Sequence, residues 1–391
     1  MTDKPRFEGE RVKLGDVCTI VSGATPKTKT GEYWDGEIKW VTPAELDSDS
    51  HYISDTEKHL TEAGYKSASL HMMPKGTVLL TTRAPIGKVA IAAEEMSCNQ
   101  GFKNLVCSSA INNEFLYLCL KSRTAELQAM GRGATFKELS KKNVAGFEIN
   151  LPAIDRQLDA VAKLTAVGNQ IARAKQQHDQ LDTLVKSRFV EMFGDSDSSA
   201  FDTVLVEDVC TDVVDCPHQT PKYQGKLTHP AIRTSELVGT TIDWSTMRYV
   251  SEEEYSRRVK RLKPRPGDVV YAREGVYGTA AILPEGYQFC LGQRTMLYRP
   301  NGELCTSSYL LYSLTSDDVK KQADMLNIGS TVPHVNVKDA KRFKIMLPPL
   351  ELQHQFADFV AQVDKSRFVV LNEKISRIQL ISRRIAHRFS R

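Results

Sequence analysis

An internal repeat constrains the fold of this 391-residue chain more than any other feature. The word DVCT begins at Asp16 and again at Asp208, and each copy continues to a Thr-Pro-Lys, at Thr25 and at Thr220. Further matches follow in the same order, always 190 to 197 residues apart, and end in a Leu-Pro pair in each half. Matches in one order at one spacing indicate a tandem duplication of about half the chain.

The middle of each half contains the longest aligned words. PKGTVLLTTRAPIGKVAIA aligns with RPGDVVYAREGVYGTAAIL, and WVTPAELD with IRTSELVG. The alignment pairs Gly76 with Gly267, Arg83 with Arg273, Gly87 with Gly278, and Tyr52–Ser54 with Tyr249–Ser251. If the two halves are one design used twice, these pairs should occupy equivalent positions.

The first part of each half is predicted to be an α+β domain that is mainly β. Short apolar runs bounded by Gly and Pro predict strands at 38–41, 78–81 and 269–271. Strict alternation predicts half-buried strands at 147–151 and 343–347, and helical periodicity is present at 114–130 and 308–326.

The second part of each half is predicted to be one long helix. Residues 153–192 contain no Pro and one Gly, and residues 350–390 contain neither. Apolar residues recur there at threes and fours, so each helix would be about 55 Å long. Two such helices favour an antiparallel coiled coil, although each could instead pack on its own domain. The expected order is a domain over 1–152, a helix over 153–193, a domain over 194–348 and a helix over 349–391.

Net charge, cysteine and histidine spacing and the length of apolar runs limit the classes of protein to which the chain can belong. The net charge of +4 permits nucleic-acid binding without demonstrating it. None of the eight cysteines forms a CxxC, and the histidines lack metal-ligand spacing, so reduced thiols and no metal are expected. No run approaches the roughly 20 apolar residues that span a membrane, and the N-terminus is polar, so a cytoplasmic location without membrane contact is expected.

The whole chain resembles the specificity subunits of type I restriction-modification enzymes. The resemblance rests on the order of domains and helices and on the words SGATPKT, TTRAPIGKVAI, GATFKEL, GSTVPHV, LPAIDRQL and LPPLELQHQ. It implies two target recognition domains that each read one half of a split double-stranded DNA sequence. It also implies helices that set the spacing and dock two modification subunits, with restriction subunits in the full nuclease. No cofactor would be bound by this chain; the partner subunits would bind S-adenosylmethionine, and ATP and Mg for restriction.

Candidate DNA contacts are Arg, Lys, Gln, His, Tyr and hydroxyl residues in loops and in one basic run, because base edges and phosphates need such donors and acceptors. A plain turn, a salt bridge or a solvated face is the alternative for each. In the first half the candidates are Thr25, Lys27, Lys29, Arg83, Lys88, Arg132, Thr135 and Lys137. In the second half they are Gln219, Lys222, Tyr223, Arg258, Arg261, Arg273, Ser330, Thr331 and His334.

Catalytic motifs are not found in the sequence. There is no GxxxxGK[ST], no Asn/Asp-Pro-Pro-aromatic word of an amino-methyltransferase, and GVYGTA is not GxGxxG. The chain is therefore predicted to bind and position DNA rather than to catalyse a reaction. The alternatives are a free-standing enzyme with a duplicated domain, and an orphan specificity protein that acts as an anti-restriction decoy or regulator.

Overall fold

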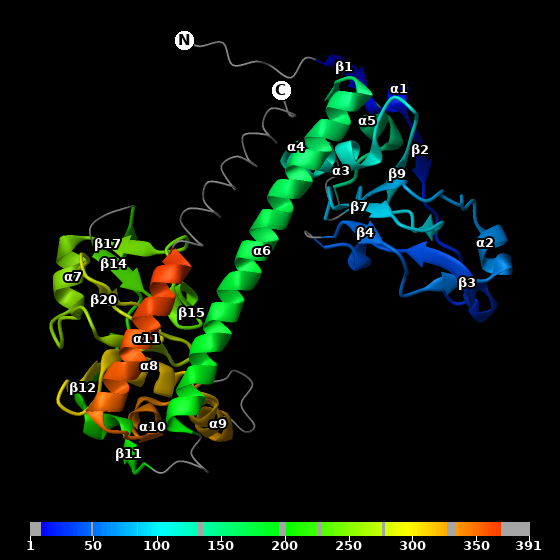
Figure 1. Ribbon diagram of the computed structural model, residues 1–391. Helices are drawn as coiled ribbons and strands as arrows, with labels where there is room; N and C mark the ends of the chain where they lie inside the picture. Colours follow the sequence, from blue (N-terminus) through cyan, green and yellow to red (C-terminus); the bar gives the residue numbers. More distant parts are fainter. Residues whose placement is uncertain are drawn as a thin grey trace, which may run out of the picture. The chain divides into compact units, whose positions relative to one another are not determined.

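The computed structural model describes residues 9–47, 50–83, 85–131, 137–194, 201–225, 229–275, 278–326 and 334–368. The chain forms two compact units that divide between Lys175 and Gln176. This boundary lies inside α6 (Ile154–Phe193), one unbroken helix of 40 residues (Figure 1). The long helix expected over 153–193 is thus confirmed, and so is the expected mixture of helix and sheet.

Unit 1 is built around two sheets. The larger has the strand order β2-β9-β6-β7-β4, and the smaller has the order β5-β3-β8. The strands are β1 (Glu10–Lys13), β2 (Cys18–Ser22), β3 (Trp34–Val41), β4 (Tyr52–Ile53), β5 (His59–Leu60), β6 (Val78–Leu80), β7 (Val89–Ala92), β8 (Ser97–Cys98), β9 (Lys103–Cys107) and β10 (Glu148–Leu151), which pairs with β1. The helices are α1 (Leu14–Val17), α2 (Glu62–Ser67), α3 (Asn113–Ser122), α4 (Thr124–Met130) and α5 (Lys141–Ala145).

Unit 2 repeats this plan. Its larger sheets have the orders β12-β21-β18-β19 and β13-β17-β14-β20, and β11 pairs with β22 as β1 pairs with β10. The strands are β11 (Thr203–Leu205), β12 (Cys210–Asp215), β13 (Tyr223–Gln224), β14 (His229–Ile232), β15 (Leu237–Val238), β16 (Thr241–Ile242), β17 (Arg248–Val250), β18 (Val269–Ala272), β19 (Ala280–Ile282), β20 (Cys290–Leu291), β21 (Thr295–Pro300) and β22 (Lys344–Met346). The helices are α7 (Glu252–Arg258), α8 (Ser307–Leu314), α9 (Asp317–Leu326), α10 (Val337–Lys341) and α11 (Leu350–Phe368). The two helices expected at 114–130 and 308–326 are each divided into two, α3 with α4 and α8 with α9.

The duplication is visible at single residues. Gly76 and Gly267, paired by the sequence alignment, both have φ of 88°, a left-handed conformation that favours glycine. The first residue of α3 or α8 donates to each glycine carbonyl. The Asn113 amide donates to Gly76 at 3.1 Å, and the Ser307 hydroxyl donates to Gly267 at 2.7 Å. The two turns are therefore one structure used twice.

A fully buried glutamine joins each long helix to its own unit. The Gln157 side chain accepts from the backbone N–H of Asn112 at 2.8 Å and donates to the carbonyls of Ala110 at 3.0 Å and Pro152 at 2.8 Å. The Gln353 side chain accepts from Thr306 at 2.9 Å and donates to the carbonyls of Leu304 at 3.0 Å and Pro348 at 2.8 Å. Each amide thus ties a helix to the loop before α3 or α8.

Two pairs in the sequence alignment are not equivalent in the structure. The N–H of Leu139 donates to the Thr82 carbonyl, and that of Val335 to the Arg273 carbonyl, both at 2.9 Å. Arg273 therefore corresponds to Thr82 and not to Arg83, which is one residue further on.

The second corrected pair is Tyr52–Ser54 with Tyr249–Ser251. Strand β17 pairs with β14 as β5 pairs with β3, each on the antiparallel side of a strand that also has a parallel neighbour. Ser251 caps α7 and Thr61 caps α2 through the same hydroxyl contact. Tyr249–Ser251 therefore corresponds to 59–61.

Within unit 2, the end of α6 packs against α11. The Phe189 ring lies 5.4 Å from Phe356, and Asp182 forms an ion pair with Arg367. Residues later in α11 contact residues earlier in α6, so the two helices pack antiparallel to each other. The rest of the expected helix, residues 369–391, lies outside the described part of the chain. Gly168 lies in the exposed middle of α6, and a Cβ built there would meet nothing within 4 Å.

Replacing Gln353 with Ala should destabilise unit 2. The change leaves one buried N–H and two carbonyls without a partner, so we expect the free energy of unfolding to fall by about 2–4 kcal/mol. Gln355→Ala, an exposed glutamine on the same helix, is the matched control and should change stability by less than about 0.5 kcal/mol. Urea unfolding of both variants decides; equal stabilities would contradict the role given to Gln353.

Candidate nucleic-acid interface

Four segments of unit 1 meet in what we name loop cluster 1, residues 23–30, 81–83, 99–103 and 137–139. Backbone N–H groups join them: Ala24 donates to Cys98 at 3.0 Å, and Thr82 donates to Gly101 at 2.7 Å. The Thr25 hydroxyl donates to the Gln100 side chain. The fold thus brings together segments that contain five predicted candidates: Thr25, Lys27, Lys29, Arg83 and Lys137.

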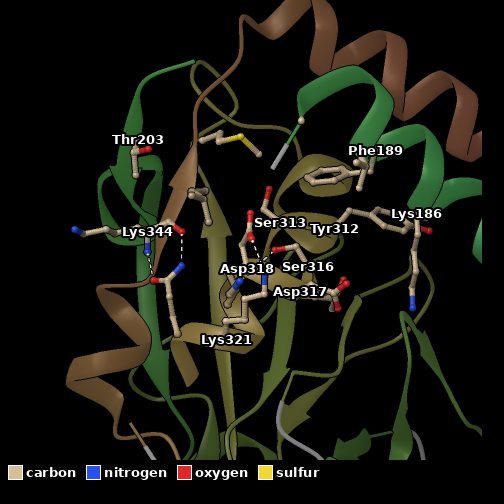
Figure 2. Close-up of a pocket in the computed structure, with 17 residues that line it drawn as sticks. Lys186, Phe189, Thr203, Tyr312, Ser313, Ser316, Asp317, Asp318, Lys321 and Lys344 are labelled. Atoms are coloured by element: carbon tan, nitrogen blue, oxygen red, sulfur yellow. Dashed lines mark hydrogen bonds and ion pairs between the residues drawn. The ribbon is translucent and has the colours of Figure 1, made fainter. Parts of the chain in front are cut away.

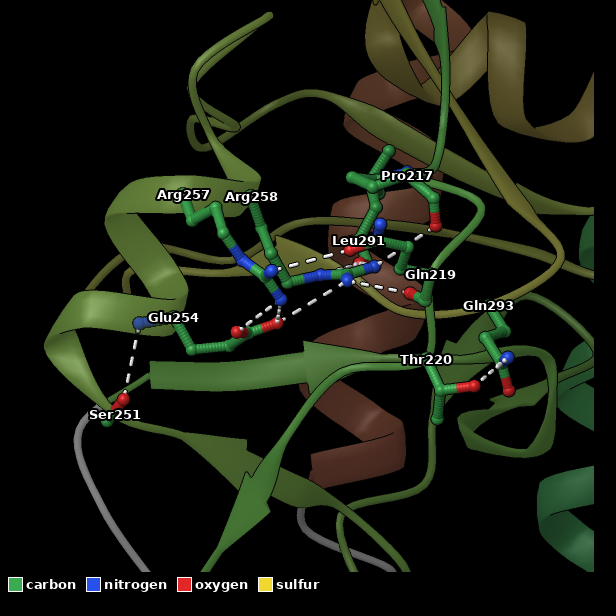
Figure 3. A network of polar contacts seen from close by, with 9 residues as sticks. All are labelled: Pro217, Gln219, Thr220, Ser251, Glu254, Arg257, Arg258, Leu291 and Gln293. Carbon is green, nitrogen blue, oxygen red and sulfur yellow. Dashed lines mark hydrogen bonds and ion pairs between the residues drawn. The ribbon is translucent and has the colours of Figure 1, made fainter.

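Loop cluster 2 is the corresponding part of unit 2, residues 215–223, 272–274, 292–294 and 334–335. Here the N–H of Cys216 donates to Thr295 at 3.1 Å, and that of Arg273 to Arg294 at 3.0 Å. The Gln293 amide donates to the Thr220 hydroxyl at 2.7 Å (Figure 3). A threonine–glutamine contact therefore holds the Thr-Pro-Lys loop in both units.

The two Thr-Pro-Lys loops have one design. Pro26 and Pro221 are buried, while the lysines that follow them, Lys27 and Lys222, are exposed. A buried proline with its fixed φ holds the backbone, so the ammonium groups are presented to solvent. Further exposed candidates are Lys29, Lys137, Gln219 and Arg261. In the part of the chain that the structure describes, the five cations among these residues form no ion pair, as phosphate-binding groups would require.

Arg258 is a correction, because it is only 6% exposed and serves the fold (Figure 3). Its guanidinium donates to the carbonyl of Leu291 at 3.0 and 2.8 Å and to that of Gln219 at 2.9 Å. Glu254 lies 3.7 Å away. Arg258 therefore positions the Gln219 loop from inside and cannot contact DNA.

Three other candidates are held by internal contacts. Arg273, 5% exposed, lies 2.8 Å from Asp215 and donates to the Val335 carbonyl at 2.9 Å, so it is structural. The Lys88 ammonium donates to the carbonyls of Pro43, at 3.3 Å, and Leu46. The guanidinium carbons of Arg248 and Arg233 lie over the Tyr223 ring, 5.0 and 5.6 Å from its centroid. Burial raises the pKa of the Tyr223 hydroxyl. The side chains of Arg273 and Lys88 are thus engaged inside the fold and are not assigned as DNA contacts.

Four candidates, Arg132, Thr135, Ser330 and Thr331, lie outside the described residues. The described residues that follow these segments are Lys137, in cluster 1, and His334, in cluster 2. The His334 imidazole is 3.0 Å from the Glu274 carboxylate.

Five polar residues of the clusters were not identified from the sequence: Gln100, Lys103, Glu274, Gln293 and Arg294. The glutamine shared by NQG and GQR is the one signal that could have found the loops at 99–103 and 292–294, which contain all of these residues except Glu274. Lys103 is half-buried, and this burial lowers the pKa of its ammonium group, an effect that nearby Glu138 opposes.

A groove of about 640 Å³ lies in unit 2 beside the end of α6 (Figure 2). Phe189, Tyr312 and Ile345 give it an apolar floor, and Lys186, Lys321 and Asp317 are at its rim. Val190, which also lines the groove, is 56% exposed. An open apolar surface with charges of both signs at its edge is typical of a protein-binding site.

Neither a metal site nor a membrane span is found where the structure is described. No group of three or more His, Cys, Asp or Glu residues among these residues could hold a metal ion. Likewise, no described helix is long and apolar enough to cross a membrane.

Two similar domains, each with a loop cluster that presents an exposed lysine and each followed by a long helix, define a duplicated modular class of protein. The family model of the type I restriction modification DNA specificity domain matches residues 8–183 and 224–380. The chain belongs to this family, as its sequence predicted, and the family's specificity subunits are recognition subunits without catalytic activity.

Curated relatives agree. The MjaIX specificity subunit of Methanocaldococcus jannaschii is 37% identical over 186 residues, which are 47% of this chain and 43% of that protein. This chain thus matches less than half of that relative's length. The MjaVIII specificity subunit of the same organism is 22% identical over 93% of this chain and 88% of its own length.

Solved structures share the fold. A chain from a study of complex assembly and conformational transition of the type I R-M system has a TM-score of 0.58 and 20% identity, with 100% of this chain and 99% of that chain covered. The S subunit from M. genitalium has a TM-score of 0.55 and 13% identity, with 100% and 98% covered. At these identities the likeness shows the fold alone.

Arg258→Met and Arg261→Met should separate folding from surface charge. Arg258→Met leaves the carbonyls of Leu291, Gln219 and Pro217 without their guanidinium donor, so we expect unit 2 to lose about 3 kcal/mol. Glu254 keeps its ion pair with Arg257. Arg261→Met, an exposed change three residues further on, should leave the melting temperature within about 1 °C. Calorimetry of both variants is the measurement. Equal melting temperatures would contradict the structural role of Arg258 and restore it as a candidate DNA contact.

Proposed function

We propose that this chain is the subunit that reads a split double-stranded DNA sequence for a type I restriction-modification complex. Each loop cluster reads one half of the target. The observation that carries the proposal is that one loop scaffold occurs twice, with a Thr–Gln contact and an exposed lysine in each copy. A module used twice suits a target with two halves.

The exposed cations are the groups that would meet the DNA backbone. The exposed cations are Lys27, Lys29 and Lys137 in cluster 1, Lys222 in cluster 2, and Arg261 elsewhere in unit 2. Ammonium and guanidinium groups that neutralise phosphates supply affinity without reading sequence. The side chains that differ between the clusters would supply the sequence preference, so the two half-sites should differ.

The long helices would set the spacing between the half-sites. In this proposal residues 1–152 and 194–348 are the recognition domains, and the helices at 153–193 and 349–391 form an antiparallel coiled coil. An α-helix of 40 residues is about 60 Å long. Half-sites one DNA turn apart are about 34–36 Å from one another, so such a spacer is long enough.

Two modification subunits would dock on this chain, and restriction subunits would complete the nuclease in the cytoplasm. The groove of Figure 2 supports a docking site at the end of α6, because Val190 offers exposed apolar surface there beside charged side chains. S-adenosylmethionine would be bound by the modification subunits, and ATP and Mg by the restriction subunits. This chain would bind none of them.

Adenine methylation mapped across genomic DNA, with and without this chain, tests the proposal. We expect one split motif that disappears when the chain is removed. Exchange of residues 1–152 for the same domain of another family member should then change one half of the motif. An unchanged methylation pattern on removal would favour the orphan or decoy role. A change in both halves after the exchange would contradict independent domains.

Val190→Asp should weaken docking. A carboxylate in the apolar groove loses hydration when a partner covers it, so the modification subunit should bind at least about 10-fold more weakly. Gln177→Asp places the same charge at an exposed α6 position outside the groove lining and is the control. Titration of each purified variant with the modification subunit gives the two affinities. Equal affinities would remove the groove from the docking surface.

A further inference from the structure

In each loop cluster a glutamate lies between an arginine and a second basic side chain, but the glutamate is on a different segment in each. In cluster 1, Glu138 lies 3.1 Å from Arg83 and 3.9 Å from Lys103. In cluster 2, Glu274 lies 2.8 Å from Arg294 and 3.0 Å from His334.

The backbone shows that the two ion-pair sites lie at equivalent positions of the two units, although the charged side chains there differ. Arg83 pairs with Glu138 across an antiparallel bridge, and Glu274 pairs with His334 across the corresponding bridge. Arg83 of cluster 1 therefore occupies the position that Glu274 occupies in cluster 2. Charge differs here while the backbone contact is kept, which is what two readers of different sequences need.

In both clusters the carboxylate holds the arginine by its Nε atom. Nε is the guanidinium atom nearest to the carboxylate for Arg83, which is 47% exposed, and for Arg294, which is 60% exposed. No other described residue accepts a hydrogen bond from either guanidinium. Because the carboxylate meets the Nε side of each guanidinium, the terminal NH₂ groups remain for a further partner, and such a fork matches the O6 and N7 acceptors of guanine.

The backbone of Arg294 adds a second observation. Its φ is 65°, and among the described non-glycine residues only Asp35 shares a positive φ. A left-handed residue with a long side chain costs free energy, and such strain concentrates at functional sites. This conformation is thus retained where the arginine reaches the cluster surface.

We propose that Arg83 reads a guanine in one half-site and that Arg294 reads a guanine in the other. Glu138 and Glu274 are positioning residues that aim the two guanidinium groups. The proposal rests on the proposed function, since it names the bases that the two clusters recognise. It also assigns the second reader to Arg294 and not to Arg273, the buried arginine that the sequence aligns with Arg83.

The test selects bound sequences from a random DNA library with the complex of this chain and its modification subunits. Arg83→Lys keeps the charge but loses the fork. We expect the preference for guanine at one position of one half-site to fall on the order of 10- to 100-fold, with the other positions unchanged. Arg294→Lys should do the same in the other half-site. Glu138→Gln should weaken the preference at the Arg83 position alone.

Arg11→Lys and Arg265→Lys are the matched controls. Arg11 is 79% exposed and its Nε lies 3.0 Å from Glu148, so it repeats the arginine–glutamate contact on β1, outside the cluster. Arg265, 63% exposed, precedes β18, whereas cluster 2 follows that strand. Neither control should change the selected sequence.

The outcomes separate the two levels of the argument. If the unaltered complex selects no split sequence, the proposed function fails and this inference fails with it. A split sequence without guanine in one half overturns the assignment for that half. An unchanged sequence after Arg83→Lys, or equal loss of affinity for all sequences, identifies Arg83 as structural or as a phosphate contact, and either result overturns the proposal.

Discussion

The buried glutamine amide at the start of each long helix fixes how that helix leaves its own unit. Gln157 and Gln353 are fully buried, and each satisfies one N–H and two carbonyls. An amide has two donors and a carbonyl acceptor in a planar group, so it satisfies all three partners in one orientation only. Because unpaired buried groups are costly, a rotation of the helix about its axis is opposed by hydrogen bonds as well as by packing. Both loop clusters depend on units whose helices are anchored in this way.

Structure and specificity are carried by different atoms in these units. The clusters are assembled by backbone hydrogen bonds, by buried prolines and by the Thr25–Gln100 and Thr220–Gln293 contacts. The charged groups at the surface have been exchanged without altering those contacts. A scaffold that does not depend on its surface charges can accept new ones, since exposed ion pairs contribute little to stability. In the proposed function, this separation would allow two copies of one domain to bind different DNA.

Much of this architecture could be predicted from the repeat. The alignment found the positive-φ glycines Gly76 and Gly267 because only glycine suits that turn. It misplaced Arg273 by one residue, because two identical letters outweighed a backbone register that letters do not encode. Arg258 and Arg261 lie in one basic run, and only the fold reveals that the first is buried and the second exposed. Arg294 was missed because its role comes from a neighbour, Glu274, that is distant in sequence.

Gly168 has a consequence for the mechanics of α6. Nothing surrounds the position of its missing side chain, so packing does not require a glycine there. Glycine lowers local helix stability by about 1 kcal/mol relative to alanine, and no buried contact offsets this loss. The backbone amides around Gly168 should therefore exchange with solvent faster than those near the anchored ends of the helix. A helix whose least stable turn lies between two packed ends can bend at that turn.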